Sequence, residues 1–329
     1  MPSFQAYTIR EKGESVQAGM ETLMTEDLPQ GDVLIRVHYS SVNYKDGMVA
    51  QPNNPLVKNY PVIPGIDLAG EVVESTDNQF SKGDQVIATS YEIGVNHFGG
   101  YSEYARIPSQ WIVPLPQELT LEQSMIYGTA GFTAALSIER LQHYGITPEK
   151  GPVLVTGATG GVGSMAVAML AKQGYEVEAS TGSESYTDFL KELGAAKVIS
   201  RKEVFDGKLK PLDKEKWAAA VDPVGGEPLA AVLSQLKYFG AAAVSGLAAG
   251  TKVPTEVYPF ILRGIALIGV DSVQCPMDIR KDIWDRLASD LNISDSLEKM
   301  KSQVSLEEVP ETLEKILNGQ TIGRTIVKV

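Results

Sequence analysis

The chain has 329 residues, of which 43% are hydrophobic and 21% are charged, so it can bury sizeable cores and is not disordered as a whole. At about 100–200 residues per domain, this length predicts two domains. The 29 lysines and arginines against 41 aspartates and glutamates give a formal net charge of −12. Because phosphates attract surfaces rich in Lys and Arg, this charge argues against nucleic acid or an anionic membrane as a partner, and favours a small molecule.

The scarcity of cysteine limits the chemistry that the chain can carry. Cys275 is the only cysteine, which excludes an intramolecular disulfide and every zinc site with two or more thiolates. The sequence does not open with a signal peptide, and no stretch reaches the roughly 18 uninterrupted apolar residues that a membrane-spanning helix needs. We therefore expect a cytoplasmic protein with no membrane partner.

Short β-like segments fill the chain up to about residue 120. Gly, Pro and Asn punctuate them, and Gly83 and Asp84 tolerate the positive φ angles of a hairpin turn. Short strands between turn signals predict a mainly β, barrel-like unit. The expected strands lie at 33–37, 70–73, 85–88 and 111–113.

Beyond that point, apolar strands alternate with glycines and helical stretches. A helix is expected over 161–173, and another runs through Leu190 and Leu193. Strands that alternate with helices predict a mostly parallel sheet covered on both faces, which is the doubly wound dinucleotide-binding fold. The six expected strands lie at 153–156, 175–180, 197–200, 218–222, 242–245 and 266–270.

The final part of the chain has a different pattern. Ser305 and Glu308 have the spacing of a capping box that opens a helix, and Gly319 is well placed to end it. The last expected strand, 325–329, has no obvious partner in the second half of the chain, so we infer that the chain returns to its first domain. We predict a discontinuous first domain at 1–121 and 293–329, and a second domain at 122–292.

A glycine-rich loop, 156–163 (TGATGGVG), lies between an expected strand and an expected helix. Glycine lets the backbone turn sharply, so that a pyrophosphate can approach the N–H groups and the positive end of the helix dipole. A tight βα turn without a ligand has similar glycines, but the flanking strand and helix favour nucleotide binding. Ser164 follows Gly163 where a Walker A loop requires lysine, so that motif is excluded. The residues predicted to bind the cofactor here are Thr159, Gly160, Gly161, Val162 and Gly163.

The end of the second strand of this half indicates which nucleotide binds. An NAD site usually has Asp or Glu at that strand end to bind the ribose 2′-hydroxyl, whereas this chain has Ser180, Thr181 and Gly182. Hydroxyl groups together with Arg201, just past the third strand, suit a 2′-phosphate. We therefore predict NADP(H) as the cofactor. NAD(H) is the alternative cofactor, because Arg201 could simply be solvated and a carboxylate, Glu178, lies nearby in the strand.

Several segments together resemble the medium-chain dehydrogenase/reductase superfamily. The resemblance is to its zinc-free quinone oxidoreductase branch of the YhdH/YhfP, acrylyl-CoA reductase type, and it extends from about residue 5 to 329. It implies an α/β protein with a GroES-like, mainly β catalytic domain and a doubly wound Rossmann domain, and an active site between them. The matching segments are 41–47 (SVNYKDG), 61–70 (PVIPGIDLAG), 99–105 (GGYSEYA), 127–136 (YGTAGFTAAL), the glycine loop, and 222–226 (DPVGG).

The resemblance also implies roles for individual residues. Zinc-dependent relatives carry a histidine ligand where this chain has Ile66, so we expect no metal and no alcohol oxidation. The resemblance places Tyr44 beside the cofactor. Asn43 and Tyr44 are the predicted catalytic residues, because an amide and a phenol can donate to a carbonyl. By family position, the remaining residues predicted to contact the cofactor are Thr133, Leu247, Ile261 and Ser272.

Two residues beside this predicted catalytic pair, and a third further along, are expected to be structural. We interpret Lys45 and Asp46 as an ion pair that shapes the loop, rather than as an acid and a base. Asp67 is expected to hold its own loop through backbone N–H groups. The alternative for the catalytic pair is also structural: Asn43 would cap a turn, and Tyr44 would pack as a half-buried aromatic residue.

The expected reaction is hydride delivery from NADPH to the activated C=C bond of an acrylyl thioester, enal or enone. An NADPH:quinone oxidoreductase is the alternative within enzymes. A non-catalytic protein that binds NADPH as a sensor or structural element is the alternative of another class, because no residue has the unmistakable spacing of a catalytic acid or base. The apolar stretch 253–270 could form an edge-to-edge sheet across a homodimer, as is common in the superfamily.

Overall fold

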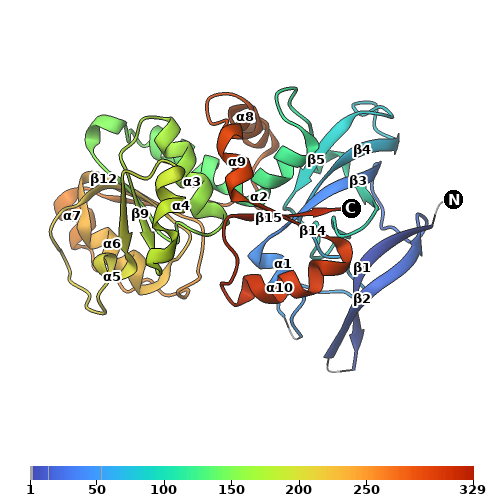
Figure 1. Ribbon diagram of the computed structural model, residues 1–329, viewed down its shortest axis with the longest axis horizontal. Helices are drawn as coiled ribbons and strands as arrows, with labels where there is room; N and C mark the ends of the chain where they lie inside the picture. Colours follow the sequence, from blue (N-terminus) through green and yellow to red (C-terminus); the bar gives the residue numbers. More distant parts are fainter. Residues whose placement is uncertain (1–2, 14, 53) are drawn as a thin grey trace. The chain divides into compact units, whose positions relative to one another are not determined.

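The computed structural model describes residues 3–13, 15–52 and 54–329, which divide into two compact units (Figure 1). Unit 1 comprises Met1–Thr129, Val273–Ala288 and Leu297–Val329. Unit 2 comprises Ala130–Ser272 and Ser289–Ser296. Within the described ranges, none of the helices combines the length and the apolar character needed to cross a bilayer.

Unit 1 is built on a seven-stranded sheet around β3 (Val33–Val42), which pairs antiparallel with three other strands. Apolar side chains of these strands, such as Ile35 and Val72, are fully buried in a core. A separate hairpin of β1 (Ser3–Lys12) and β2 (Ser15–Met24) packs beside it. The other strands of the sheet are β4 (Asp67–Ser75), β5 (Gln85–Thr89), β6 (Tyr104–Ile107), β7 (Ile112–Pro114), β14 (Lys301–Ser305) and β15 (Arg324–Lys328).

Two short helices of unit 1 pack against each other, although they lie far apart in the sequence. They are α1 (Tyr44–Val49) and α10 (Val309–Leu317). The capping box of Ser305 and Glu308 is present just before α10, and the expected strand at 325–329 is β15, which pairs with β3. The chain therefore does return to the first sheet. The two remaining helices of this region are α8 (Met277–Ala288) and α9 (Ser294–Met300).

Unit 2 contains a parallel six-stranded sheet with the strand order β10-β9-β8-β11-β12-β13. The order reverses between β8 (Val153–Val155) and β11 (Trp217–Asp222), and helices lie on both sides of the strands (Figure 1). This is the doubly wound arrangement that the alternating pattern predicts, and ligands bind such sheets where the order reverses, at the carboxyl ends of the strands. The other strands are β9 (Val177–Thr181), β10 (Lys197–Ser200), β12 (Leu236–Val244) and β13 (Ala266–Gly269).

The helices of unit 2 follow the strands in the expected alternation. The predicted helix at 161–173 is α3 (Gly161–Lys172), which contacts β8, β9 and β11. A long helix, α2 (Leu121–His143), begins within unit 1 and is interrupted at Gly128, whose φ of 49° and ψ of −157° are not helical. The remaining helices are α4 (Thr187–Glu192), α5 (Arg201–Val204), α6 (Gly226–Gln235) and α7 (Tyr258–Arg263).

The units differ from the predicted domain bounds at three places, the smallest of which is the assignment of residues 293–296 to unit 2. Unit 2 begins after Thr129, and α8, which we expected in the second domain, belongs to unit 1. The reason for the placement of α8 is Arg280 of this helix, whose fully buried guanidinium donates to the carbonyl and hydroxyl oxygens of Thr89. The same guanidinium lies 4.4 Å from the ring centroid of Tyr91, so both contacts fix α8 to the end of β5.

Candidate functional site

The glycine-rich loop leads from β8 into the N-terminus of α3. Gly160 is the residue before the helix, and the first turn of α3 carries no acidic residue that would repel an anion. A Cβ on Gly163 would overlap the carbonyl of Gly157, so glycine is what lets the helix start this close to the loop. Thr159, Gly160, Gly161 and Val162 are partly accessible, and the first N–H groups of a helix have no partners within it. This end of α3 suits a pyrophosphate.

The carboxyl end of β9 carries a cation where an NAD site usually carries a carboxylate. Ser180 and Thr181 end the strand, and a Cβ on Gly182 would overlap the guanidinium of Arg201. The Arg201 side chain therefore lies directly over Gly182. Glu178, the residue that kept NAD open, lies further back in the strand, where it accepts from Trp217 Nε1 at 2.8 Å and lies 3.9 Å from Lys197 Nζ. The strand end itself is positive, as a 2′-phosphate requires.

Asp222 lies at the point where the strand order reverses. It ends β11, and its carboxylate accepts from the Thr156 hydroxyl at 2.7 Å and from the N–H groups of Val224 and Gly225. Burial raises the pKa of Asp222, and these three donors act in the opposite direction. The bonds join the start of the glycine loop to the turn before α6, which fixes the backbone on both sides of the expected cofactor site.

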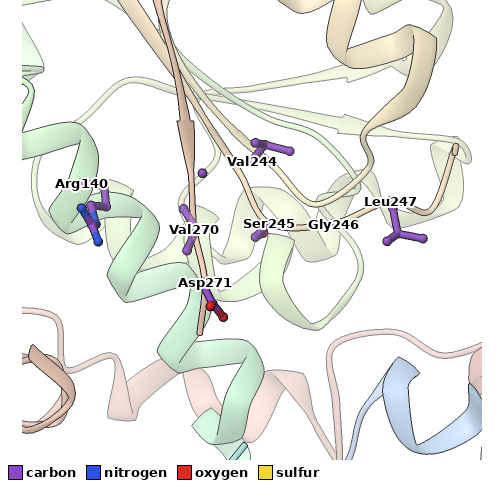
Figure 2. A pocket seen from close by; sticks show the side chains of 8 residues that line it. Arg140, Val244, Ser245, Gly246, Leu247, Val270 and Asp271 are labelled. Carbon is purple, nitrogen blue, oxygen red and sulfur yellow. The ribbon is translucent and has the colours of Figure 1, made fainter. Parts of the chain in front are cut away.

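A pocket of about 560 Å³ opens at the carboxyl ends of β12 and β13 (Figure 2). Figure 2 shows its lining residues at the ends of the two strands and on the segments that follow them, with Arg140 approaching from α2. Of the residues predicted to contact the cofactor, Leu247 lines this pocket. The hydroxyl oxygen of Ser245, which also lines it, is buried and has no hydrogen-bond partner among the described residues. A buried hydroxyl of this kind is available to a polar group of a ligand.

Three other residues predicted from family position lie outside this lining. Thr133 is buried in α2, and its carbonyl accepts from the Ser137 hydroxyl at 2.7 Å. Ser272 is half-buried and follows the strand that ends at Gly269. Ile261 lies on α7 with 69% of its surface exposed, among other exposed apolar residues. Its place on an exposed apolar surface gives Ile261 a different explanation from cofactor contact.

In unit 1, Asn43 and Tyr44 stand at the start of α1, and their side chains have opposite environments. Tyr44 is 49% exposed, whereas Asn43 is 8% exposed. The Asn43 amide nitrogen donates to Asp67 Oδ2 at 2.8 Å, and its amide oxygen accepts from Arg324 Nη1 at 3.2 Å. The geometry therefore does not support Asn43 as a donor to a substrate carbonyl, because both ends of its amide are used internally. It supports the structural alternative for Asn43, while the phenol of Tyr44 stays accessible.

Asp67 and Arg324 form the centre of a buried polar cluster around Asn43. Asp67 accepts from the hydroxyl groups of Ser41 and Thr129, at 2.6 and 2.5 Å, and from the Thr129 N–H at 2.9 Å. We expected this aspartate to hold its loop through backbone N–H groups; one such donor is present, from Thr129, but side-chain donors dominate. Arg324 Nη2 lies 3.9 Å from Asp67 Oδ2 and 2.9 Å from the Ser41 hydroxyl. The break in α2 at Gly128 makes room for these groups.

Asp46 is a second buried carboxylate, and the expected ion pair with Lys45 is wrong. Its oxygens accept from main-chain N–H groups: Oδ2 from Asn43, and Oδ1 from Gly65 and Ile66. The residue is fully buried, and burial together with the nearby charge of Asp67 raises the pKa of Asp46 to about 7. Lys45 is partly exposed, and burying its ammonium group beside Asp46 would be costly.

The sequence patterns missed Arg324, Ser41 and Thr129 as members of this cluster. Ser41 and Thr129 do lie within segments that resemble the superfamily, 41–47 and 127–136. Those segments were the sequence signal that could have identified them. Arg324 stands in an expected strand, and no local pattern connects it with Asn43, which lies 281 positions earlier. Within the described residues, no three or more His, Cys, Asp or Glu side chains gather in a group that could hold a metal ion.

Taken together, the features of unit 2 fit a phosphorylated dinucleotide. The start of α3 can receive the pyrophosphate, and Arg201 over Gly182 can receive a 2′-phosphate. The unpartnered Ser245 hydroxyl lies at the carboxyl edge of the same sheet. These three features would hold different parts of one NADP(H) molecule along the edge where doubly wound sheets bind ligands.

Comparison with known proteins identifies two family domains. Residues 29–117 match the alcohol dehydrogenase GroES-like domain, and residues 161–289 match the zinc-binding dehydrogenase domain. The first match lies within unit 1. The second covers all the strands of unit 2 that follow the glycine loop. The expected combination of a GroES-like domain with a Rossmann domain is confirmed.

Similar proteins align over almost the whole chain. Acrylyl-CoA reductase AcuI of Ruegeria pomeroyi is 46% identical over 99% of each chain. The crystal structure of YhfP of Bacillus subtilis, with NAD bound, is 55% identical over 100% of each chain, with a TM-score of 0.98. That of the YhdH oxidoreductase of Salmonella enterica, in complex with NADP, is 44% identical over 99% of each chain, with a TM-score of 0.95. The resemblance read from the motifs is confirmed: the chain belongs to the zinc-independent quinone oxidoreductase and acrylyl-CoA reductase group of the medium-chain dehydrogenase/reductases, and it is an oxidoreductase.

Proposed function

We propose that this protein is an NADPH-dependent reductase that delivers hydride to the activated C=C bond of an acrylyl thioester, enal or enone. The observation that carries the choice of cofactor is the guanidinium of Arg201 over Gly182, at a strand end without a carboxylate. The acceptor class rests on the similarity to acrylyl-CoA reductase AcuI over nearly the whole chain. YhfP was crystallised with NAD, so the preference for NADPH is a property to be measured for this chain.

Most of the residues that would hold NADPH lie in unit 2, and Tyr44 of unit 1 is also predicted to lie beside the cofactor. The N–H groups of Gly161 and Val162 at the start of α3 would bind the pyrophosphate, and Ser180, Thr181 and Arg201 would bind the adenosine 2′-phosphate. Leu247 and the Ser245 hydroxyl would contact the nicotinamide end. When bound, the reduced nicotinamide supplies the hydride.

Unit 1 would supply the group that stabilises the product of that transfer. Hydride addition at Cβ builds negative charge on the carbonyl oxygen of the acceptor, and a fixed hydrogen-bond donor lowers the energy of that oxyanion. Tyr44 is the candidate donor because its phenol is accessible while the preceding residue is held on both sides of its amide. Removing one such donor costs about 100- to 1,000-fold in rate.

A quinone is the second candidate acceptor, because YhfP carries the name of a quinone oxidoreductase. Hydride transfer to a quinone yields a hydroquinone anion, which needs the same donor. The purified protein should be given NADPH with acryloyl-CoA, a series of enals and enones, and naphthoquinones, and the acceptors ranked by kcat/KM. We expect acryloyl-CoA or an enone to rank first, and the Tyr44→Phe variant to lose rate with every acceptor. Naphthoquinones at the head of the ranking would favour the second candidate.

We also propose that the protein is a homodimer, through a surface that we name the apolar edge. β13 is the last strand of the parallel sheet, so its outer backbone groups face no strand of that sheet. Large apolar side chains are exposed on and beside it, and such patches mark interfaces in soluble proteins. Ile261 is one of them, which explains its exposure. The apolar edge comprises Tyr238, Phe239, Val257, Tyr258, Ile261, Leu262 and Leu267.

A further inference from the structure

Asp46 joins two segments of unit 1 through main-chain contacts, and its carboxylate also has a side-chain hydrogen bond with Tyr101. Its Oδ2 accepts from the N–H of Asn43 at 2.9 Å, where α1 begins. Its Oδ1 accepts from the N–H groups of Gly65 at 3.1 Å and Ile66 at 2.9 Å, in the turn that precedes β4. One carboxylate therefore ties the start of a helix to a turn about twenty residues further along the chain.

The start of α1 is held by several hydrogen bonds from outside the helix. A helix of a single turn or two is marginal on its own, since nucleation costs more than the few hydrogen bonds return. Here the backbone of Asn43 is bound by Asp46, and the side chain of Asn43 is bound by Asp67 and Arg324. The other side of α1 is closed by α10, because a Cβ on Gly47 would overlap the side chain of Leu317.

These contacts surround one accessible side chain, that of Tyr44. Tyr44 follows Asn43 directly and is 49% exposed, while Asn43, Asp46 and Gly47 are buried. A hydrogen-bond donor stabilises a developing oxyanion best when it is held in place before the reaction, and a misplacement of about 1 Å can cost about 100-fold in rate. A buried charge is also expensive to keep unless its hydrogen bonds are used. An apolar residue at this position would leave the three main-chain N–H groups without their acceptor, so the carboxylate is what holds these two segments together.

We propose that Asp46 is a positioning residue for the reaction: its buried carboxylate clamps the Asn43 N–H to the Gly65 and Ile66 N–H groups and thereby fixes the phenol of Tyr44 toward the acceptor. This inference rests on the proposed function, in which Tyr44 donates to the acceptor. Asp46 itself touches neither cofactor nor acceptor, because it is fully buried.

The substitution Asp46→Asn tests the clamp with the smallest change in volume. An amide has one acceptor oxygen and one donor nitrogen, so in either orientation its NH₂ group faces an N–H group that the carboxylate had accepted. At least one of the two tethered segments is then released, while the shape of the side chain is kept. Asp84→Asn is the matched control. Asp84 is exposed, and its carboxylate also accepts a main-chain N–H, from Ser81 at 2.7 Å.

We expect Asp46→Asn to lower kcat for the best acceptor by about 10- to 100-fold and to leave the dissociation constant of NADPH nearly unchanged. In the Tyr44→Phe background the same substitution should have almost no further effect on kcat, since its consequence passes through the phenol. Amide hydrogen exchange of the protein without cofactor should show faster exchange at Gly65, Ile66 and Asn43. Asp84→Asn should keep both the wild-type rate and the wild-type exchange at these three amides.

Additive losses in the double variant would overturn the inference while leaving the reductase function and the role of Tyr44 intact. Unchanged rates in Tyr44→Phe would instead show that Tyr44 is not the hydrogen-bond donor. The positioning role of Asp46 would then be wrong as well. If Asp46→Asn does not fold, hydrogen exchange in the wild-type protein provides the test. Three amides held by one carboxylate should open together with a common free energy, and clearly different opening energies would overturn the clamp.

Discussion

Arg201 and Gly182 show how a missing side chain can determine the choice of a cofactor. The guanidinium occupies the volume that any Cβ at position 182 would take, so it reaches the end of β9 from the start of α5. The positive charge then stands where NAD-binding relatives of this fold place a carboxylate. Cofactor preference in this chain is therefore expected to depend on a contact between one arginine and one phosphate.

Replacing Arg201 by alanine should remove the preference for NADPH. Hydrogen bonds to charged groups contribute about 1.5–3 kcal/mol, so we expect the dissociation constant of NADPH to rise by about 10- to 100-fold. The dissociation constant of NADH should stay nearly constant, because NADH lacks the 2′-phosphate. Fluorescence titration of both nucleotides measures the two constants, with the exposed neighbour Lys202→Ala as control. Equal weakening of NADPH and NADH would contradict this role.

Asp46 also predicts how stability depends on pH. Burial raises the pKa of Asp46 from 3.8 to about 7, so between these two values the folded protein holds a proton that the unfolded chain releases. Folding is then coupled to proton uptake, and the contribution of this group to stability falls as the pH rises from about 4 to about 7. The melting temperature of the wild type minus that of Asp46→Asn should decrease over this range, when thermal unfolding is followed at several pH values. A difference that increases with pH would show that the carboxylate is ionised throughout.

At the scale of elements, the sequence predicts best where one segment carries the whole signal. The strand expected at 197–200 has the bounds of β10, and the helix expected from Gly161 is α3 to within one residue at its end. In α3 a long apolar stretch follows glycines at the start of the helix, so local chemistry decides it. The hairpin of β1 and β2 was not predicted, because none of the residues of β2 is buried and the strand shows no clean alternation of apolar and polar residues.

The candidate site divides in the same way. The glycine loop and the end of β9 lie within a few residues of chain, and their pattern alone indicates a phosphorylated nucleotide. The cluster around Asn43 needs side chains from β3, β4, α2 and β15, which only the fold brings together. The amide of Asn43 was therefore predicted to face a substrate, when its partners are Asp67 and Arg324.

The first turn of α3 provides a prediction at this scale. Gly163→Ala places a methyl group against the carbonyl of Gly157, which must push the helix start away from the loop. We expect weaker binding of both NADPH and NADH, since the pyrophosphate is common to them, and calorimetric titration measures the loss. Gly19→Ala in β2 is the control, because a Cβ there meets nothing within 4 Å. Unchanged affinity in Gly163→Ala would mean that the pyrophosphate does not bind at this helix.

For the whole molecule, the apolar edge predicts the state of association. Ile261→Asp places a charge on that surface, and a charge in the centre of an apolar interface is costly to desolvate. We expect the variant to be monomeric at concentrations where the wild type is a dimer, as measured by sedimentation or light scattering. Met24→Asp in unit 1 is the control, because it changes another exposed apolar residue in the same way. A wild-type protein that is monomeric at every concentration would contradict the proposed dimer.

The position of β15 has a consequence for synthesis on the ribosome. This strand lies between β14 and β3 in the sheet of unit 1, and it brings Arg324 to Asn43. Translation delivers it only after the entire parallel sheet of unit 2 has emerged, so β3 must wait with an open edge while about 280 further residues are made. A nascent chain stalled before Arg324 should therefore carry a finished nucleotide-binding half and an unfinished Tyr44 half, which partial proteolysis of ribosome-bound chains would distinguish.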